Sequence, residues 1–250
     1  MIQAALPLLS VLTVPATGSE MNGWMVLTND ETRQKYGTFA SCLYPRVSIL
    51  DPTVTCTVSP TYSAYAAVDA TSHLLEGYFT GCDPYVAVQD RLVEGLVRTI
   101  METASEIQRD PNDREARATF MWCATLAWNG LCTAGIGPFS TPGHVLEHPV
   151  SGLYDIAHGA GLSITLPAWM KFAAQRGNTK IVKLAERLFG IGSGSEAEKA
   201  QGAIAALERW YTSIGSPTRF WQASIPESDI DLIARQASYH WAHPIEGIRT

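Results

Sequence analysis

Asp69 and His73 have the residue types and the spacing needed to hold a metal ion. They stand four positions apart in the segment VDATSH, and a helix would place both on one face with their Cβ atoms roughly 5–6 Å apart. A carboxylate oxygen and an imidazole nitrogen together suit Fe(II), Zn(II) or Mn(II). The neighbours Ala66, Ala67 and Leu74 are apolar, which indicates a buried helix, and a buried aspartate without a partner is costly. A surface helix face or a capping contact is the simpler interpretation of this pair alone.

A second group of histidines lies further along the chain. His144 and His148 are also four apart, in the segment GHVLEH, and His158 follows ten residues later. The zincin protease motif needs a glutamate directly after its first histidine, and Val145 stands there, so a metalloprotease is disfavoured. Three histidines and one carboxylate would complete a tetrahedral metal shell, to which water or substrate could add. A hydrogen-bonded core residue is the simpler interpretation of each histidine alone, and the joint spacing makes metal binding an equal alternative.

The segment LTVPATGSE is another candidate for chemistry. A strand is expected to run into a turn that contains Thr13, Thr17 and Ser19, and small hydroxyl residues at the carboxyl end of a strand can bind ribose or phosphate oxygens. The alternative is a capping turn in which Ser19 starts a short helix. Neither a GxGxxG fingerprint nor a phosphate-binding GxxxxGKS/T loop is present.

The remaining histidines and several tryptophans are expected to be structural. His240 and His243 lie in a region of weak pattern and are interpreted as surface or packing residues. Trp122, Trp128 and Trp169 fall at helical positions, which favours the core, although one of them could form the wall of a pocket.

The elements that must position these residues fall into two parts. Segments 8–14, 25–29 and 46–50 are expected to be buried strands, and the apolar start of the chain, 1–16, is interpreted as buried strand rather than as a secretion signal. From residue 59 the period is helical, and we expect helices over 60–78, 84–106, 113–128, 162–175, 179–189, 195–214 and 228–239, with one more after the Gly/Pro-rich linker 135–143. A few strands come first along the chain, and only helices follow them. This order predicts that residues 1–58 belong to an incomplete α/β domain and residues 59–250 to a helical domain.

The composition of the chain limits the kinds of partner that it is expected to bind. Its 250 residues carry a formal net charge of −6 and no run of lysine or arginine, so a nucleic-acid-binding surface is not expected. No stretch reaches the roughly 18 apolar residues that a membrane span needs. The five cysteines are an odd number without CxxC spacing, which is typical of a reducing cytoplasm. Small molecules and other copies of the chain are the expected partners.

Seven segments resemble, in the same order, those of iron-containing (group III) alcohol dehydrogenases: LTVPATGSEMN, YPRVSILDP, VDATSHLLEGY, QDRLVEGLVRTI, ATFMWCATLAWNGL, GHVLEHPVSGLYDIAHGAGL and LPAWMK. The similarity runs from about Leu8 to about Thr218 and is strongest toward the NADPH-dependent butanol dehydrogenase and aldehyde reductase subgroup. It implies a mainly α fold: the helical metal-binding domain of the iron-alcohol-dehydrogenase and dehydroquinate-synthase-like fold, preceded by the last strands of a Rossmann-like α/β domain.

The resemblance also implies a role for each candidate near the metal. Asp69, His73, His144 and His158 match the metal ligands, which would hold Fe2+ or Zn2+. His148 matches a histidine close to the nicotinamide and the substrate that is not a ligand, and it is the expected catalytic residue.

The cofactor and the partners follow from the same resemblance. Thr13, Thr17 and Ser19 match the cofactor-side strand and turn, and Lys35 matches a lysine near the cofactor's ribose. The implied activity is hydride transfer between NADP or NAD and a small-molecule aldehyde or primary alcohol, in a cytoplasmic homodimer.

Departures from the family keep alternatives open. The GGGS phosphate loop of the family's first domain is absent, so we expect about one domain to be missing and this chain alone to show little dehydrogenase activity. The segment PFSTP replaces a tryptophan-containing stretch, and Pro149 stands where a glutamate often follows His148, which affects the shape of the substrate pocket. The alternatives are a truncated, catalytically impaired homologue that binds metal or only oligomerises, and a metal-dependent hydrolase with the same ligands. Glycerol dehydrogenase and dehydroquinate synthase relatives fit the segments less well.

Overall fold

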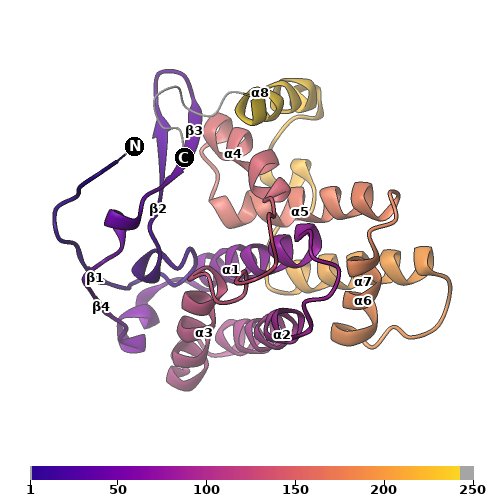
Figure 1. Cartoon of the computed structure of the whole chain (residues 1–250), viewed down its shortest axis with the longest axis horizontal. Helices are drawn as coiled ribbons and strands as arrows, with labels where there is room; N and C mark the ends of the chain where they lie inside the picture. The colour runs from indigo at the N-terminus through magenta and orange to yellow at the C-terminus, as the bar shows by residue number, and fades with distance from the viewer. Residues whose placement is uncertain (1, 243–250) are drawn as a thin grey trace.

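The computed structural model describes residues 2–242, with side chains described as far as Ser238. Helices dominate it and gather on one side of the molecule, while the strands lie on the other (Figure 1). The helices are α1 (Pro60–Thr80), α2 (Ala87–Arg109), α3 (Arg114–Ala127), α4 (Pro142–Tyr154), α5 (His158–Ala174), α6 (Thr179–Leu188), α7 (Glu196–Ser213) and α8 (Ile230–Ala242). The predicted mainly α fold class is confirmed. Within residues 2–242, none of the helices is both long and apolar enough to cross a membrane.

Polar residues fix where several helices begin, which is why their bounds were predictable. The Ser59 side chain accepts a hydrogen bond from the first turn of α1, and Pro60 occupies a position whose N–H has no helical acceptor in any case. Asp113 caps α3 in the same way. Ser195 and Glu198 form a reciprocal capping box at the start of α7.

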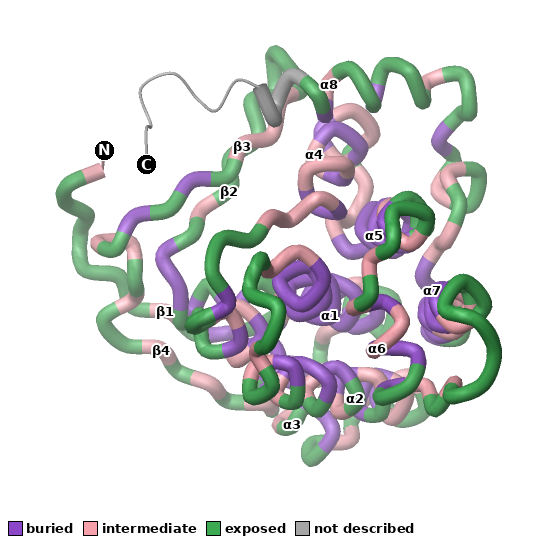
Figure 2. The backbone as a smooth tube through the Cα atoms, turned by 45° about the vertical axis from the view of Figure 1, so that its right-hand side comes forward, coloured by how far each residue is buried: buried purple, intermediate pink, exposed green. Residues whose placement is uncertain are grey.

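Helix α1 forms the centre of the helical part. It packs against α2, α3 and α5, and Figure 2 shows it buried along most of its length. Small residues on α1, such as Ala64, Ala67 and Ala70, are fully buried and let the neighbouring helices approach closely. Because α1 is surrounded, its polar residues Asp69 and Glu76 lie inside the protein, where they need partners.

Four short strands precede the helices, in two separate pairs. β1 (Leu9–Val11) pairs in parallel with β4 (Val47–Ile49), and β2 (Trp24–Asn29) pairs in antiparallel register with β3 (Gln34–Phe39). The prediction that these segments are buried was wrong, since Leu9 is 63% exposed and Val47 is 52% exposed. Most of residues 2–14 are exposed as well. A two-stranded sheet cannot cover its own faces, and no layer of described residues packs over this one.

The β2–β3 hairpin lies against α4. A Cβ added at Gly152 of α4 would come within 2.5 Å of the carbonyl oxygen of Arg33 in the hairpin turn, so this approach requires glycine. Arg33 has a φ of 57°, in the left-handed region that the turn demands. The contact brings Lys35 of β3 beside the side chains of α4. Strand β3 was not predicted, because Gln34–Phe39 lacks a run of β-branched residues.

Candidate metal centre

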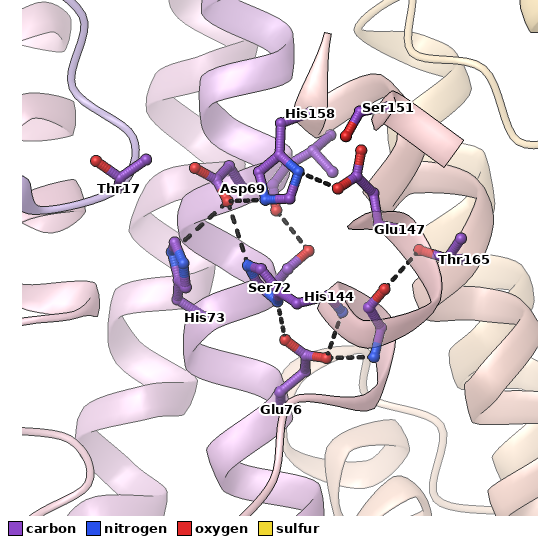
Figure 3. Close-up of polar contacts among 12 residues, drawn as sticks. Thr17, Asp69, Ser72, His73, Glu76, His144, Glu147, Ser151, His158 and Thr165 are labelled. Carbon is purple, nitrogen blue, oxygen red and sulfur yellow. Dashed lines mark hydrogen bonds and ion pairs between the residues drawn. The ribbon is translucent and has the colours of Figure 1, made fainter. Parts of the chain in front are cut away.

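Three helices bring one aspartate and three histidines to a common point. Asp69 and His73 come from α1, His144 from the first turn of α4, and His158 from the first residue of α5. The Oδ1 atom of Asp69 lies 3.7 Å from His73 Nδ1, 3.6 Å from His144 Nε2 and 3.7 Å from His158 Nε2 (Figure 3). Four side chains from distant parts of the sequence therefore direct a ligand atom toward one position.

These atoms are suited to a metal ion rather than to each other. Asp69 Oδ1, His73 Nδ1 and His144 Nε2 are buried and have no hydrogen-bond partner among the described residues. Buried polar atoms without partners are costly and rare. Two atoms that each bind a metal at about 2.1 Å lie about 3.4 Å apart in tetrahedral geometry, close to the spacing around Asp69. The donor set of one carboxylate and three imidazoles fits Fe(II) or Zn(II).

Glu76 supports His144 from behind. Its fully buried carboxylate accepts hydrogen bonds from the backbone N–H groups of Gly143 and, at 3.1 Å, His144, and it pairs with His144 Nδ1. It thereby caps α4, whose N-cap residue Thr141 makes no side-chain cap. Gly143 leaves the room that the carboxylate needs, because a Cβ there would lie 2.8 Å from Glu76 Oε1. This arrangement fixes the ring and directs Nε2 toward Asp69.

Glu147 supports His158 in a different way. Its carboxylate pairs with His158 Nδ1 and lies 3.6 Å from the ammonium group of Lys35. That ammonium also donates to Ser151 Oγ at 2.9 Å and lies 3.3 Å from His158 Nδ1. Since Nδ1 carries either one hydrogen or one lone pair, and the closer contact is to a carboxylate, Nδ1–H donates to Glu147 and Nε2 keeps its lone pair. Gly161 makes space for Glu147, because a Cβ there would lie 2.6 Å from its Oε1.

The buried histidines His73 and His144 differ in the direction in which their pKa values are shifted. Burial alone would raise the pKa of Asp69, but the neighbouring imidazoles, His73 first, outweigh it and hold that pKa below its usual range. Burial lowers the pKa of His73 to about 3 against the opposing effect of Asp69, so this ring stays neutral and can act as a ligand. Burial would also lower the pKa of His144, but Glu76 and Asp69 outweigh it and raise that pKa to about 10. A metal ion bound at His144 would therefore have to displace a proton from this ring.

A cavity of about 720 Å³ opens beside these residues. The helical side contributes His73, His144, His148 and His158, and the aromatic part of the wall comes from Trp24, Trp128 and Phe139. The N-terminal part of the chain contributes Thr17, Ser19 and Lys35. The cavity is thus lined by aromatic and apolar side chains together with a few imidazoles and hydroxyls, as small-molecule sites commonly are.

Comparison with known proteins decides the family. The model described as "Fe-containing alcohol dehydrogenase family, C-terminal" matches residues 63–245, and "Iron-containing alcohol dehydrogenase" matches residues 1–52. The chain belongs to the iron-containing alcohol dehydrogenase family. The resemblance stated from the sequence is confirmed.

Individual relatives agree with this assignment. The chain is 39% identical over 238 residues to the probable NADH-dependent butanol dehydrogenase 1 of Bacillus subtilis (strain 168). The aligned residues cover 93% of this chain and 60% of that protein. It is 34% identical over 240 residues to the NADPH-dependent aldehyde reductase YqhD of Escherichia coli (strain K12), covering 96% and 61%. The crystal structure of NADH-dependent butanol dehydrogenase A from Thermotoga maritima superposes with a TM-score of 0.91 at 40% identity, covering 98% of this chain and 61% of that one. The chain spans about three fifths of the length of these relatives.

The other predicted residues of this dehydrogenase-family chain fall in different places. Thr17, Ser19 and Lys35 line the cavity, whereas Thr13 is exposed and is not part of its wall. The ring of His148 lies 5.8 Å from that of His158, between centroids, and also lines the cavity.

Two tryptophans that were expected in the core lie in different environments. Trp128 lines the cavity and stacks on His73 with ring centroids 4.7 Å apart. Trp122 is 51% exposed, so its predicted place in the core was wrong: it lies on the outer face of α3. The side chain of His240 and the whole of His243 lie outside the described residues.

Sequence reasoning missed the two glutamates behind the imidazoles. Glu76 follows His73 by three residues and Asp69 by seven, and Glu147 follows His144 by three. These are spacings that share a helix face, so the signal was present in the helical period. The spacing alone did not reveal the role of either glutamate, because that role depends on which imidazole the carboxylate faces. This in turn depends on how α1, α4 and α5 pack.

Proposed function

We propose that this chain binds one divalent metal, Fe2+ or Zn2+, through Asp69, His73, His144 and His158. We further propose that the chain acts in an NAD(P)H-linked alcohol dehydrogenase or aldehyde reductase of the butanol dehydrogenase type. The observation that carries the proposal is the Asp69 Oδ1 atom, which faces three imidazole nitrogens at 3.6–3.7 Å beside a cavity large enough for a small molecule. The family and the names of its relatives support the reaction class.

The cofactor is proposed to enter the same cavity from the N-terminal side. Thr17 and Ser19 offer hydroxyl groups there, Lys35 offers a positive charge, and Thr13 would contact the cofactor from the exposed strand end. Relatives named as NADH-dependent and as NADPH-dependent both occur, which supports a nicotinamide cofactor. In this proposal residues 1–58 form part of the cofactor side, and 59–250 form the metal-binding domain.

The residues of the chain would divide the work of the reaction. When bound, the metal would act as a Lewis acid toward the oxygen of the aldehyde or alcohol. His148 lines the cavity beside the ligand group and would pass the proton between that oxygen and solvent. Trp24, Trp128 and Phe139 would hold an apolar carbon chain and exclude water from the reacting carbon. The two buried glutamates would keep His144 and His158 oriented throughout.

Metal analysis of purified variants tests the ligand set. Asp69→Ala and His158→Ala should abolish stoichiometric metal binding, and His148→Ala should leave it intact, because His148 is not one of the four proposed ligands. The measurement is metal content per chain after dialysis against Fe2+ or Zn2+. Full metal retention by Asp69→Ala and His158→Ala would reject this ligand set.

Turnover is tested separately from metal binding. Reduction of butanal by the metal-loaded chain with NADH or NADPH would support the dehydrogenase function directly. Stoichiometric metal binding without turnover would support the alternative of a catalytically impaired metal-binding homologue.

A further inference from the structure

A second group of possible metal ligands lies beside the proposed centre. Glu147, His148 and His158 each offer one ligand atom, and these atoms lie within 4.8 Å of one another. His158 belongs to both groups, since its Nε2 faces Asp69 while its Nδ1 faces Glu147. An imidazole with a candidate cation position on each side is the arrangement of a bridged two-metal site.

Lys35 already places a positive charge at the second position. Its ammonium lies 3.6 Å from Glu147 Oε2 and 3.3 Å from His158 Nδ1, two atoms that a second metal would need. Ser151 accepts a hydrogen bond from the same ammonium at 2.9 Å and anchors it. A divalent ion bound to Glu147 and His158 would lie within a few ångströms of this charge, and like charges at such distances repel strongly where water is scarce.

The balance of charge around the centre also argues against a second cation beside Lys35. Three buried carboxylates lie beside the three ligand imidazoles: Asp69, Glu76 and Glu147. In residues 2–242, Lys35 is the only lysine or arginine that forms an ion pair with any of them. With neutral imidazoles, Lys35 and one divalent ion together offset the three negative charges. Without Lys35, the same carboxylates would leave one negative charge uncompensated beside Glu147.

We propose that Lys35 takes the place of a second metal ion and keeps the centre mononuclear. Removing its charge opens a latent site made of Glu147, His148 and His158 to a second divalent ion. Binding there replaces the Nδ1 hydrogen of His158, which leaves as a proton to solvent, and the imidazolate ring then bridges the two ions. This inference rests on the metal centre proposed above.

The test counts metal ions in chelator-stripped full chains dialysed against Co2+. The wild type should bind one equivalent, Lys35→Met two, and Lys35→Arg one, because arginine keeps the charge. Lys35→Met combined with Glu147→Gln should return to one equivalent. The pair of ions in Lys35→Met should also show exchange coupling by electron paramagnetic resonance, which a distant adventitious ion does not. Lys35→Gln carries the same test if Lys35→Met does not fold.

Lys171→Met is the matched control. Lys171 also pairs with a glutamate, Glu208 at 2.7 Å, but on the surface and away from the histidines, so this variant should still bind one ion. A single equivalent in Lys35→Met, or two in the wild type, would overturn the inference about Lys35. A second ion that persists with Glu147→Gln or lacks coupling would overturn it as well. No bound ion in the wild type, or full binding by Asp69→Ala, would instead reject the proposed metal centre itself.

Discussion

The centre contains two carboxylate–imidazole pairs that use the same chemistry with different support. Glu76 and His144 lie deep between α1 and α4, and the carboxylate is also held by two backbone N–H groups. Glu147 and His158 lie between α4 and α5, nearer the cavity, and the second partner of this carboxylate is the side chain of Lys35. The His144 side chain is 11% exposed and that of His158 is 25% exposed.

The two pairs therefore differ in how closely each is tied to the helical fold. Because Glu76 caps a helix, its pair belongs to the helical core and cannot change without disturbing α4. The Glu147 pair depends on a hairpin outside that core, so its charge balance can change while the helices stay in place. One half of the proposed centre is therefore also a structural element of the helical fold, and we infer that the other half sets how much charge the site accepts.

The largest expected effect is on stability and distinguishes the two pairs. Glu76→Ala should lower the free energy of unfolding of chelator-treated protein by about 3–5 kcal/mol, because it leaves His144 and the start of α4 without their buried acceptor. Glu147→Ala should cost less than half as much, since water reaches His158 and Lys35 at the cavity. Urea unfolding followed by circular dichroism measures both, and equal losses would show that the pairs are equally supported.

Metal affinity should respond strongly to the second pair as well. Glu147→Gln should weaken metal binding by about 10–100-fold, because the amide cannot accept from His158 Nδ1–H with the strength of a carboxylate. Its unfolding free energy without metal should remain close to that of the wild type. Competition with a chromophoric chelator gives the affinity, and Glu208→Gln, a surface carboxylate paired with Lys171, is the control that should leave it unchanged. Wild-type affinity in Glu147→Gln would remove this residue from the centre.

The pH dependence of metal binding should report on the first pair alone. The pKa of His144 is raised to about 10, so its ring is protonated at neutral pH, and a metal must release that proton. Affinity should therefore rise with pH, by about tenfold per pH unit between roughly pH 6 and 8 from this proton. Glu76→Gln removes the main charge that holds the proton and should flatten this slope, while Glu147→Gln should keep it. Titration calorimetry in buffers of different ionisation enthalpy counts the protons, and an unchanged count in Glu76→Gln would contradict this assignment.

The smallest expected effect concerns the hairpin that carries Lys35. Gly152→Ala places a methyl group against the Arg33 carbonyl, which should push β3 away from α4 and lower metal affinity severalfold. Gly95→Ala is the control: its added methyl meets nothing within 4 Å on α2, and it should raise the free energy of unfolding by about 0.5–1 kcal/mol. An unchanged metal affinity in Gly152→Ala would show that the hairpin does not position Lys35.

Local signals made the helices and the pairing of Asp69 with His73 predictable, whereas the choice of His144 and His158 over His148 came from the family resemblance. Caps such as Ser59 and Asp113 fix where helices begin, and the four-residue spacing of Asp69 and His73 reports directly on one helix face. The strands were found less well. Leu9 and Val47 have the apolar character of buried strands, but their burial depends on what packs over the sheet, and no local pattern encodes that.

Long-range contacts account for what the sequence could not give. Lys35 and Ser151 are 116 residues apart in the chain, and their contact depends on the packing of the hairpin against Gly152. Lys35 was singled out only through a family resemblance, as a cofactor contact. Its position between Glu147 and His158 is a property of the assembled fold.

Trp128 gives the protein an optical reporter of its own. Its indole stacks on His73 with ring centroids 4.7 Å apart, so the excited ring lies next to any open-shell ion that the imidazole binds. Such ions quench nearby indoles efficiently, whereas Zn2+, with its filled d shell, does not. The intrinsic emission of this chain should therefore tell, without any label, which of the two kinds of ion it has taken up.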